Sequence, residues 1–406
     1  MAIEYRPARS DEMRAFVRAN QIGFGAAAGE ADVDRALAHT MNQPEWTLCA
    51  FEDGAPVSQM TTYPFTMRWN GRDLSCGGVT SVSTLPTHRR RGHLRELMTR
   101  SFATMRDAGQ PVAMLWASMA AIYQRFGYGI AFTNHVSSFR PRDLRFVDSA
   151  RPRGRVRLLP TDEAPVVLGP VYERFAAPRT LMLHRSDEMW RQGVLRVWPP
   201  DSAPYLIAVY EESDEALGYV IYSVEQARDR RPGPDLTLHV PEFVWLATAA
   251  HRALVELLAG YDLAEEVRLY RMAADDPLFH LVDEPRLLNI KQMDGTLVRL
   301  TDVRQALEGR GYNADGAVSF VLHDDLCPWN SGGWRLTVDG GKGRLAPASE
   351  TAIEVTPRAL AMLASGHVSA TALSRAGMLT ASGPAALAAA DALFRVPHAP
   401  LCLDGF

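Results

Sequence analysis

The chain has few cysteines and no CxxC pair, which excludes two common ways of stabilising a fold. Its four cysteines lie far apart, at Cys49, Cys76, Cys327 and Cys402. A disulfide scaffold needs denser cysteines, and a structural zinc site needs closely spaced ones. No spacing of histidine, cysteine and aspartate suggests a set of metal ligands either. We therefore expect a protein of a reducing compartment that uses no metal.

Long apolar runs and excess positive charge are also missing. No stretch of about 20 apolar residues occurs, and residues 1–16 lack the continuous apolar core of a secretion signal. The sequence therefore predicts a cytoplasmic protein without a membrane partner. Its formal net charge of −4 gives no global attraction to nucleic acid. Because the phosphate-binding patterns GxxxxGK[ST] and GxGxxG are absent, any anion site must be local.

An antiparallel meander is predicted after Trp46. Three runs of alternating apolar residues are separated by the dipeptides Asp53-Gly54 and Asn70-Gly71, which are preferred hairpin turns. Pro86 ends the last strand. Apolar residues then recur at helical spacing over residues 94–105, followed by a buried strand at residues 112–116 and a short helix at residues 119–126.

A second set of elements in the same order follows an Arg- and Pro-rich stretch near residue 150. It looks like a decayed copy of the first domain, because its region before the helix, residues 247–254, lacks the triple arginine and the glycine. From residue 291 strands and helices alternate with Gly-rich turns. We expect three α+β domains, at residues 1–150, 151–290 and 291–406.

The stretch "STLPTHRRRGHLRELM", residues 83–98, places positive charge and a glycine where a strand enters a helix. The first N–H groups of a helix have no internal partner, and the helix dipole adds about half a positive charge there. Gly92 would let the backbone approach a phosphate closely, and the arginines would neutralise it, so the pattern fits a pyrophosphate cradle. A solvated basic helix start is the alternative reading.

The order of elements around this motif resembles the GNAT superfamily of acetyl-CoA-dependent N-acetyltransferases, whose pyrophosphate loop reads [RQ]-x-x-G-x-[GA]. The chain matches the arginine and the first glycine and departs at Leu94. Together, the strand ending in "PTHRRRGHL" and the later "IYQRFGYG" look like the enhanced-intracellular-survival (Eis) family. In that family two GNAT (acyl-CoA N-acyltransferase) folds, the second degenerate, precede a sterol-carrier-like domain.

The resemblance implies a place for the cofactor and for the chemistry. It puts acetyl-CoA along the backbone of Val82, Ser83 and Thr84, where Thr84 departs from the family's usual valine. The residues that would surround the rest of the cofactor are Arg90, Arg91, Gly92, His93, Leu94 and Arg95 at the pyrophosphate, with Ser118 and Met119 on the other side. Tyr123 would be the general acid, and the carboxylate of Phe406, in a tail that returns to the active site, the general base.

Each implied role has a simpler alternative. Tyr123 could be a core tyrosine, or Tyr128 could take its role. His88 and His93 are expected to be loop and surface residues rather than bases. The tail could be frayed, although its apolar ending favours docking.

The resemblance further implies an amine acceptor and an oligomer. The expected acceptor is a small cationic amine such as an aminoglycoside, which would make the protein an antibiotic-resistance enzyme. A protein lysine or a natural-product amine is the alternative acceptor. Glu30, Asp32 and Asp34, with Asp404 on the tail, are weak candidates for an acidic lining. A lipid-binding protein with an inactive first domain is the rival function, and the assembly implied is a hexamer.

Overall fold

The computed structural model describes residues 3–38, 40, 42–148, 152–197, 202–227 and 233–406. Internal contacts divide the chain into two compact units. Unit 1 comprises Met1–Ala131, Thr296–Val396 and Phe406, and unit 2 comprises Phe132–Gly295 and Pro397–Gly405. The expected boundary at residue 150 lies outside the described residues. None of the described helices has the length and apolar character that crossing a membrane requires.

Unit 1 contains a seven-stranded sheet in the order β1-β2-β3-β4-β5-β14-β6. Its strands are β1 (Ile3–Arg6), β2 (Thr47–Glu52), β3 (Ala55–Arg68), β4 (Asp73–Thr84), β5 (Val112–Leu115), β6 (Gly129–Ile130) and β14 (Leu297–Leu300). The predicted meander is confirmed as β2 to β4. Both residues of each turn have a positive φ, 51° and 80° at Asp53-Gly54 and 50° and 82° at Asn70-Gly71. A type I′ hairpin requires that conformation.

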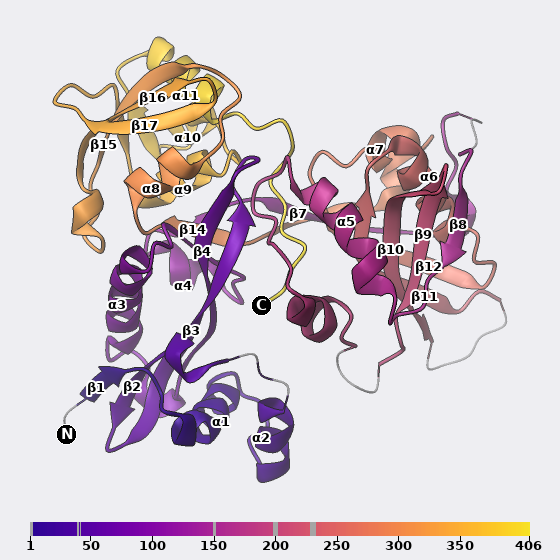
Figure 1. Ribbon diagram of the computed structural model, residues 1–406, viewed down its shortest axis with the longest axis horizontal. Coiled ribbons are helices and arrows are strands. Elements are labelled where there is room, and N and C mark those ends of the chain that lie inside the picture. Colours follow the sequence, from indigo (N-terminus) through magenta and orange to yellow (C-terminus); the bar gives the residue numbers. More distant parts are fainter. Residues whose placement is uncertain (1–2, 39, 41, 149–151, 198–201, 228–232) are drawn as a thin grey trace. The chain divides into compact units, whose positions relative to one another are not determined.

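Four helices accompany this sheet: α1 (Met13–Gly23), α2 (Glu30–Leu37), α3 (His93–Asp107) and α4 (Ala120–Gln124). The apolar face predicted for α3 is buried, with Leu97, Met98 and Phe102 packed in one cluster with Val79 of the sheet and Tyr128. Figure 1 shows α3 running beside the strands of the meander. α3 thereby connects the parallel strands β4 and β5.

A smaller five-stranded sheet, in the order β17-β16-β15-β18-β19, completes unit 1. Its elements are α8 (Val303–Gly309), β15 (Gly316–Leu322), β16 (Gly332–Asp339), β17 (Lys342–Pro347), β18 (Ile353–Val355), α9 (Pro357–Ala364), α10 (Ala370–Arg375), β19 (Leu379–Ala381) and α11 (Pro384–Phe394). The fully buried Arg310 ties α9 to α11 by donating to the carbonyls of Ala364 and Phe394, each at 2.8 Å. Burial lowers the pKa of Arg310 to about 10.

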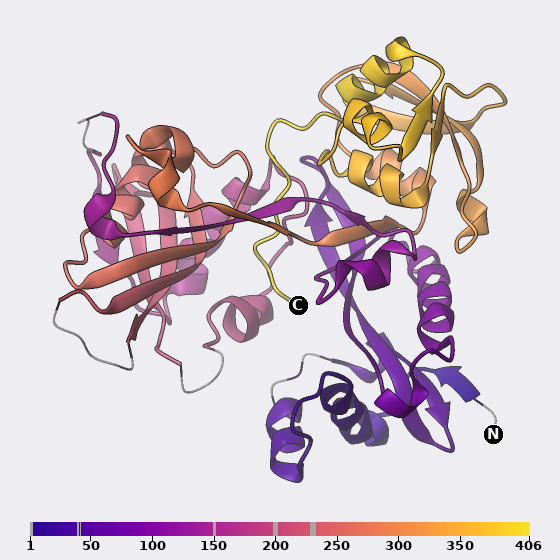
Figure 2. The same ribbon diagram turned by 180° about the vertical axis from the view of Figure 1, so that it is seen from behind.

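Unit 2 contains a second seven-stranded sheet, in the order β13-β7-β12-β11-β10-β9-β8. Its strands are β7 (Thr133–Phe139), β8 (Arg155–Leu158), β9 (Leu206–Glu212), β10 (Glu215–Gln226), β11 (Leu236–Trp245), β12 (Ala264–Met272) and β13 (Lys291–Asp294), and its helices are α5 (Ala164–Ala176), α6 (Thr248–Ala259) and α7 (Leu278–Leu281). Figure 2 shows β7 beside its antiparallel partner β13. The series β9-β10-β11-α6-β12 repeats β2-β3-β4-α3-β5, including the parallel last pair. The internal copy is therefore real.

A buried ion pair connects the two sheets of unit 1. Arg299 of β14 donates to Asp324, with 2.5 Å between Nη2 and Oδ2, and to the carbonyl of Phe126 at 3.0 Å. The two side chains are 1% and 2% exposed. A charge so deeply buried needs its partner, because water cannot replace it.

We predict that Asp324→Ala destabilises unit 1 strongly, because it leaves the Arg299 charge buried without a counterion. The expected loss is about 3–5 kcal/mol of unfolding free energy, measured by chemical denaturation of the full chain. Asp339→Ala, at an exposed position on β16, is the control and should change stability by less than about 0.5 kcal/mol. Equal losses in the two variants would contradict this account.

Candidate active site

The site begins where two parallel strands separate. β4 and β5 pair only from Cys76 with Val112 to Gly78 with Met114. β4 continues to Thr84 without β5 beside it, and a cavity of about 350 Å³ lies in the opening. The cavity is lined by Phe24, Val79, Thr80, Ser81, Val82, Trp116, Ala117, Ser118, Tyr123 and Phe406. It is therefore built from the end of one strand, the segment after the next, and α4.

A β-bulge interrupts β4 at this cavity. Thr80 pairs with Thr61 and Ser83 with Gln59, so that Ser81 and Val82 together oppose one residue of β3. Ser81 has a φ of 53°, unusual for a residue other than glycine. A bulge leaves its extra residue outside the ladder and redirects the chain. The backbone at Ser81 and Val82 is thus available to a ligand in the cavity.

The residues after the bulge differ in their side-chain bonding. The Ser83 hydroxyl is buried and has no hydrogen-bond partner among the described residues. The Thr84 hydroxyl lies 2.7 Å from that of Ser58. A buried polar group without a partner is costly in a folded protein, and it marks a place where a ligand can bond.

The loop before α3 leaves the start of this helix open. Arg90 and Gly92 have φ values of 63° and 87°. No side chain caps the helix, and a Cβ on Gly92 would meet nothing within 4 Å. Arg89 is tied back to the carbonyl of Gly23 at 2.9 Å, whereas Arg90 and Arg91 are exposed and form no ion pair within the described part of the chain. The uncapped backbone amides at the start of α3, together with the guanidiniums of Arg90 and Arg91, form a candidate site for an anion.

The first residues of α3 point their side chains elsewhere. His93 is buried, with Nδ1 2.9 Å from the Tyr5 hydroxyl, and burial lowers its pKa. The expectation that His93 is a surface residue is therefore wrong. Leu94 packs into the core cluster of unit 1, and Arg95 is exposed. At this end of the helix the backbone of His93 and Leu94, not their side chains, can face an anion.

Tyr123 and Phe406 lie together in the cavity lining. Tyr123 is 9% exposed, and burial raises the pKa of its hydroxyl. The ring of Phe406 packs on Phe65 at 5.1 Å between centroids, and a Cβ on Gly78 would lie 3.3 Å from it. Tyr128 is fully buried and does not line the cavity. Among the lining residues, Tyr123 is the one with an ionisable side chain, and Phe406 is the last residue of the sequence.

Ser118 and Met119 differ in position. Ser118 lines the cavity, and Met119 is the exposed residue that precedes α4. Trp116 and Phe24 also line it and were not expected from the sequence. The place of Trp116 at the end of the predicted buried strand was a usable signal, whereas Phe24 lies in a small-residue loop without one.

The three acidic residues expected to line an acceptor site do not line this cavity. Glu30, Asp32 and Asp34 lie on α2. Their partners are arginines: Arg14 and Arg18 for Glu30, Arg14 for Asp34, and Arg35 for Asp32. These exposed ion pairs neutralise the acidic cluster, so it offers little attraction to a cation.

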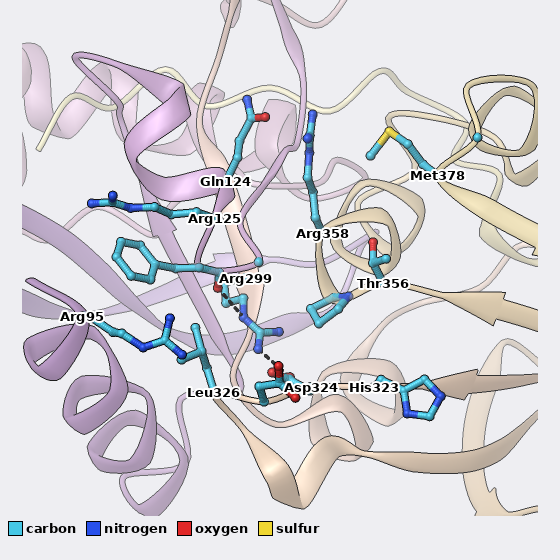
Figure 3. A pocket seen from close by; sticks show the side chains of 15 residues that line it. Arg95, Gln124, Arg125, Arg299, His323, Asp324, Leu326, Thr356, Arg358 and Met378 are labelled. Carbon is cyan, nitrogen blue, oxygen red and sulfur yellow. Dashed lines mark hydrogen bonds and ion pairs between the residues drawn. The ribbon is translucent and has the colours of Figure 1, made fainter. Parts of the chain in front are cut away.

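A second cavity of about 490 Å³ lies beside α3 and α4 and is shown in Figure 3. It is lined by Arg95 of α3, Arg125 directly after α4 and Arg358 of α9, together with the Arg299–Asp324 pair. The Nε of Arg358 is buried without a hydrogen-bond partner among the described residues. No residue lines both cavities. Tyr123 and Phe406 line the first cavity and not the second.

Comparison with known proteins agrees with this architecture. Residues 4–131 and 181–300 each match a family model described as acetyltransferase (GNAT) domain, and residues 303–403 match the sterol carrier protein domain. A mixed sheet that opens between β4 and β5, with a helix start at Gly92, thus defines a GNAT-type N-acetyltransferase. The expected fold class and enzyme class are confirmed.

Proteins that match over most or all of the chain identify the family within this class of acetyltransferases. An uncharacterized N-acetyltransferase of Streptomyces avermitilis is 32% identical over 100% of both chains. N-acetyltransferase Eis of Mycobacterium tuberculosis is 31% identical over 79% of this chain and 78% of its own. The crystal structure of Eis1 from Mycobacterium abscessus superposes with a TM-score of 0.85 at 29% identity, covering 100% of both chains. The chain belongs to the Eis family of N-acetyltransferases.

Proposed function

We propose that this enzyme transfers the acetyl group of acetyl-CoA to a primary amine of a small cationic acceptor. The observation that carries this proposal is the cavity between the separated strands, which has Tyr123 and Phe406 in one lining. A phenol and a carboxylate are the two groups that amine acetylation needs, one to give a proton and one to take it.

The cofactor is assigned to β4 and the start of α3. GNAT acetyltransferases in general use acetyl-CoA, which supplies an acetyl group already activated as a thioester. The β-bulge at Ser81 and Val82 and the Ser83 hydroxyl, which has no hydrogen-bond partner among the described residues, fit a polar chain lying along the strand. The open helix start at Gly92, beside Arg90 and Arg91, fits a pyrophosphate. The residues present therefore suit the cofactor.

The acceptor nitrogen loses two protons during the reaction, and the departing thiolate gains one. An ammonium group has to lose one before its nitrogen can attack, and the Phe406 carboxylate takes this proton, directly or through a water molecule. The departing thiolate has to be stabilised, and the Tyr123 hydroxyl donates a proton to it. The nitrogen loses its second proton as the amide forms, and this proton returns through water to the Tyr123 oxygen. Burial keeps Tyr123 protonated at neutral pH because it raises the pKa. Tyr123 thus starts with the proton that its role needs.

An aminoglycoside is the first acceptor to test, because a polyamine would be drawn to the carboxylate of Phe406. A protein lysine or a natural-product amine is the alternative. A CoA-release assay with aminoglycosides, polyamines and lysine peptides separates these acceptors, and turnover is expected with at least one polyamine.

A chain that binds no CoA and acetylates nothing would instead favour an apolar-ligand function of the third domain. Light scattering tests the hexamer implied by the family.

The cradle can be tested at Gly92. Gly92→Asp should abolish acetyl-CoA binding in calorimetry, because the new carboxylate fills the open space and repels the pyrophosphate. Gly92→Ala introduces the backbone strain without the charge, so it should weaken acetyl-CoA binding less than Gly92→Asp does. Gly109→Asp is a matched control, since Gly109 also has a positive φ, 68°, with open space around it. Loss of binding in the control would contradict the assignment.

Tyr123→Phe should lower kcat by about 10² to 10⁴ while the affinity for acetyl-CoA stays unchanged, since it removes a proton donor with little change in packing. Tyr128→Phe is the control. Its hydroxyl is buried and lacks a hydrogen-bond partner among the described residues, so the variant should keep full turnover. If the two variants lose activity equally, the acid is not Tyr123.

The Phe406 carboxylate can be moved or neutralised. Adding one glycine after Phe406 shifts the carboxylate by about 3.5 Å, and amidation of Phe406 by protein ligation removes its charge without changing the side chain. Both changes should reduce kcat by about 10² to 10⁴ at unchanged CoA affinity, whereas an N-terminal tag should be harmless. Full activity in the amidated enzyme would contradict the assignment of the Phe406 carboxylate as the general base.

A further inference from the structure

The parallel strands of the second domain separate at the same place as those of the first, but their opening is filled. β11 and β12 pair from Leu236 with Ala264 to Val240 with Leu269. In the first domain the corresponding opening holds a cavity of about 350 Å³. Here a cavity of only about 80 Å³ remains, and His398 and Leu401 line it together with Trp245 of β11. The C-terminal segment of the chain occupies the rest.

Three backbone contacts hold this segment in unit 2. The amide of Ala399 donates to Asp275 at 2.9 Å, and the amide of Leu401 donates to the carbonyl of Thr180 at 3.1 Å. The Arg271 guanidinium, on β12 just beyond the last paired residue, donates to the carbonyl of Leu403. Contacts to the main chain fix the position of the segment rather than the identity of its side chains.

A buried charge cluster fixes its register. Arg185 donates through Nε to Asp404 at 2.7 Å and through Nη1 and Nη2 to Glu242 at 2.8 and 2.6 Å. The three side chains are between 1% and 4% exposed. The Tyr172 hydroxyl lies 3.1 Å from Asp404, and the Tyr219 hydroxyl donates to Glu242 at 2.5 Å. Asp404 is therefore part of this cluster and is not an acidic lining for the acceptor.

The start of the helix that follows β11 lacks the features that would bind the phosphates of a cofactor in this opening. α6 begins after Ala247, which has an extended φ of −141° and no cap. It has neither a left-handed glycine nor the row of arginines that precedes α3. A phosphate cradle is thus absent from this described region. Beyond the residues that pair β11 with β12, Arg271 binds the Leu403 carbonyl, and Glu242 binds Arg185, which in turn binds Asp404.

From these contacts we propose that the opening of the second domain is the binding site of the chain's own C-terminal segment, residues 399–404, and that Arg185 is a positioning residue for catalysis. The segment replaces the cofactor that such an opening holds in an active copy. Only Gly405 separates Asp404 from Phe406, so fixing Asp404 confines the Cα of Phe406, which bears the terminal carboxylate, to within about 7 Å of the Cα of Asp404. This inference rests on the proposed role of that carboxylate.

The test compares Asp404→Asn with the wild-type full chain. The variant keeps the shape of the side chain and loses the charge that Arg185 holds. Carboxypeptidase A needs several residues in an extended, accessible tail, so it should release Phe406 about tenfold faster or more from the variant. In separate assays kcat should fall by about 10²-fold, with acetyl-CoA affinity within about twofold. Arg185→Lys keeps the positive charge but loses the planar guanidinium that binds two carboxylates. It should speed the release of Phe406 and lower kcat, each by less than Asp404→Asn does.

Glu211→Gln is the matched control, because Glu211 also pairs with arginines in unit 2, Arg155 and Arg157, but does not contact the C-terminal segment. It should leave both readouts unchanged. If Asp404→Asn yields no folded protein, Arg271→Gln, which removes only the bond to Leu403 from the segment, serves in its place.

The outcomes separate this inference from the proposed function. Phenylalanine release at the wild-type rate in Asp404→Asn overturns the binding site. Faster release at full kcat overturns the positioning role of Arg185. A wild-type enzyme that acetylates no amine refutes the proposed function instead, and the release assay still decides whether the segment is bound.

Discussion

The candidate active site depends on the separation of β4 from β5 after Gly78 and Met114. Parallel strands need a crossover, and the crossover helix α3 starts at the edge of the sheet where β4 ends. The opening, the helix start at Gly92 and α4 therefore all arise at one edge. Gly78 stands at the point of separation, where a Cβ would come within 2.3 Å of the Phe65 ring. Any side chain there would displace the aromatic packing on which Phe406 lies.

The parts of this fold that follow from local physics could be predicted from the sequence. Asp53-Gly54 and Asn70-Gly71 specify tight turns whatever surrounds them, because few other residues adopt two successive positive φ angles. The stop of α3 near Gly109 and the basic loop before Gly92 are equally local. The resemblance drawn from these motifs gave the correct family, and the residues it indicated include four that line the cavity: Val82, Ser118, Tyr123 and Phe406.

The parts that depend on distant partners could not be predicted in this way. Residues 297–300 read Leu-Val-Arg-Leu, and an arginine is seldom fully buried unless it is paired. All four are buried, because Asp324 satisfies the Arg299 charge and β14 pairs with β5 on one side and β6 on the other. Asp404 is a similar case, since its partner Arg185 lies 219 residues earlier. No local pattern marks either pair.

The two copies show how one architecture is divided between chemistry and support. The first has an open helix start at Gly92 and a cavity between its separated strands, whereas the second has Ala247 at the start of the matching helix. A purely apolar groove would bind Leu401 and Leu403 in more than one register, because a shift by two residues returns the same face of an extended chain. One buried guanidinium shared by Glu242 and Asp404 removes that ambiguity, since a shifted segment would leave its charges unpaired. The charge cluster therefore selects a single position for the end of the chain, at a cost in desolvation that an apolar contact would avoid.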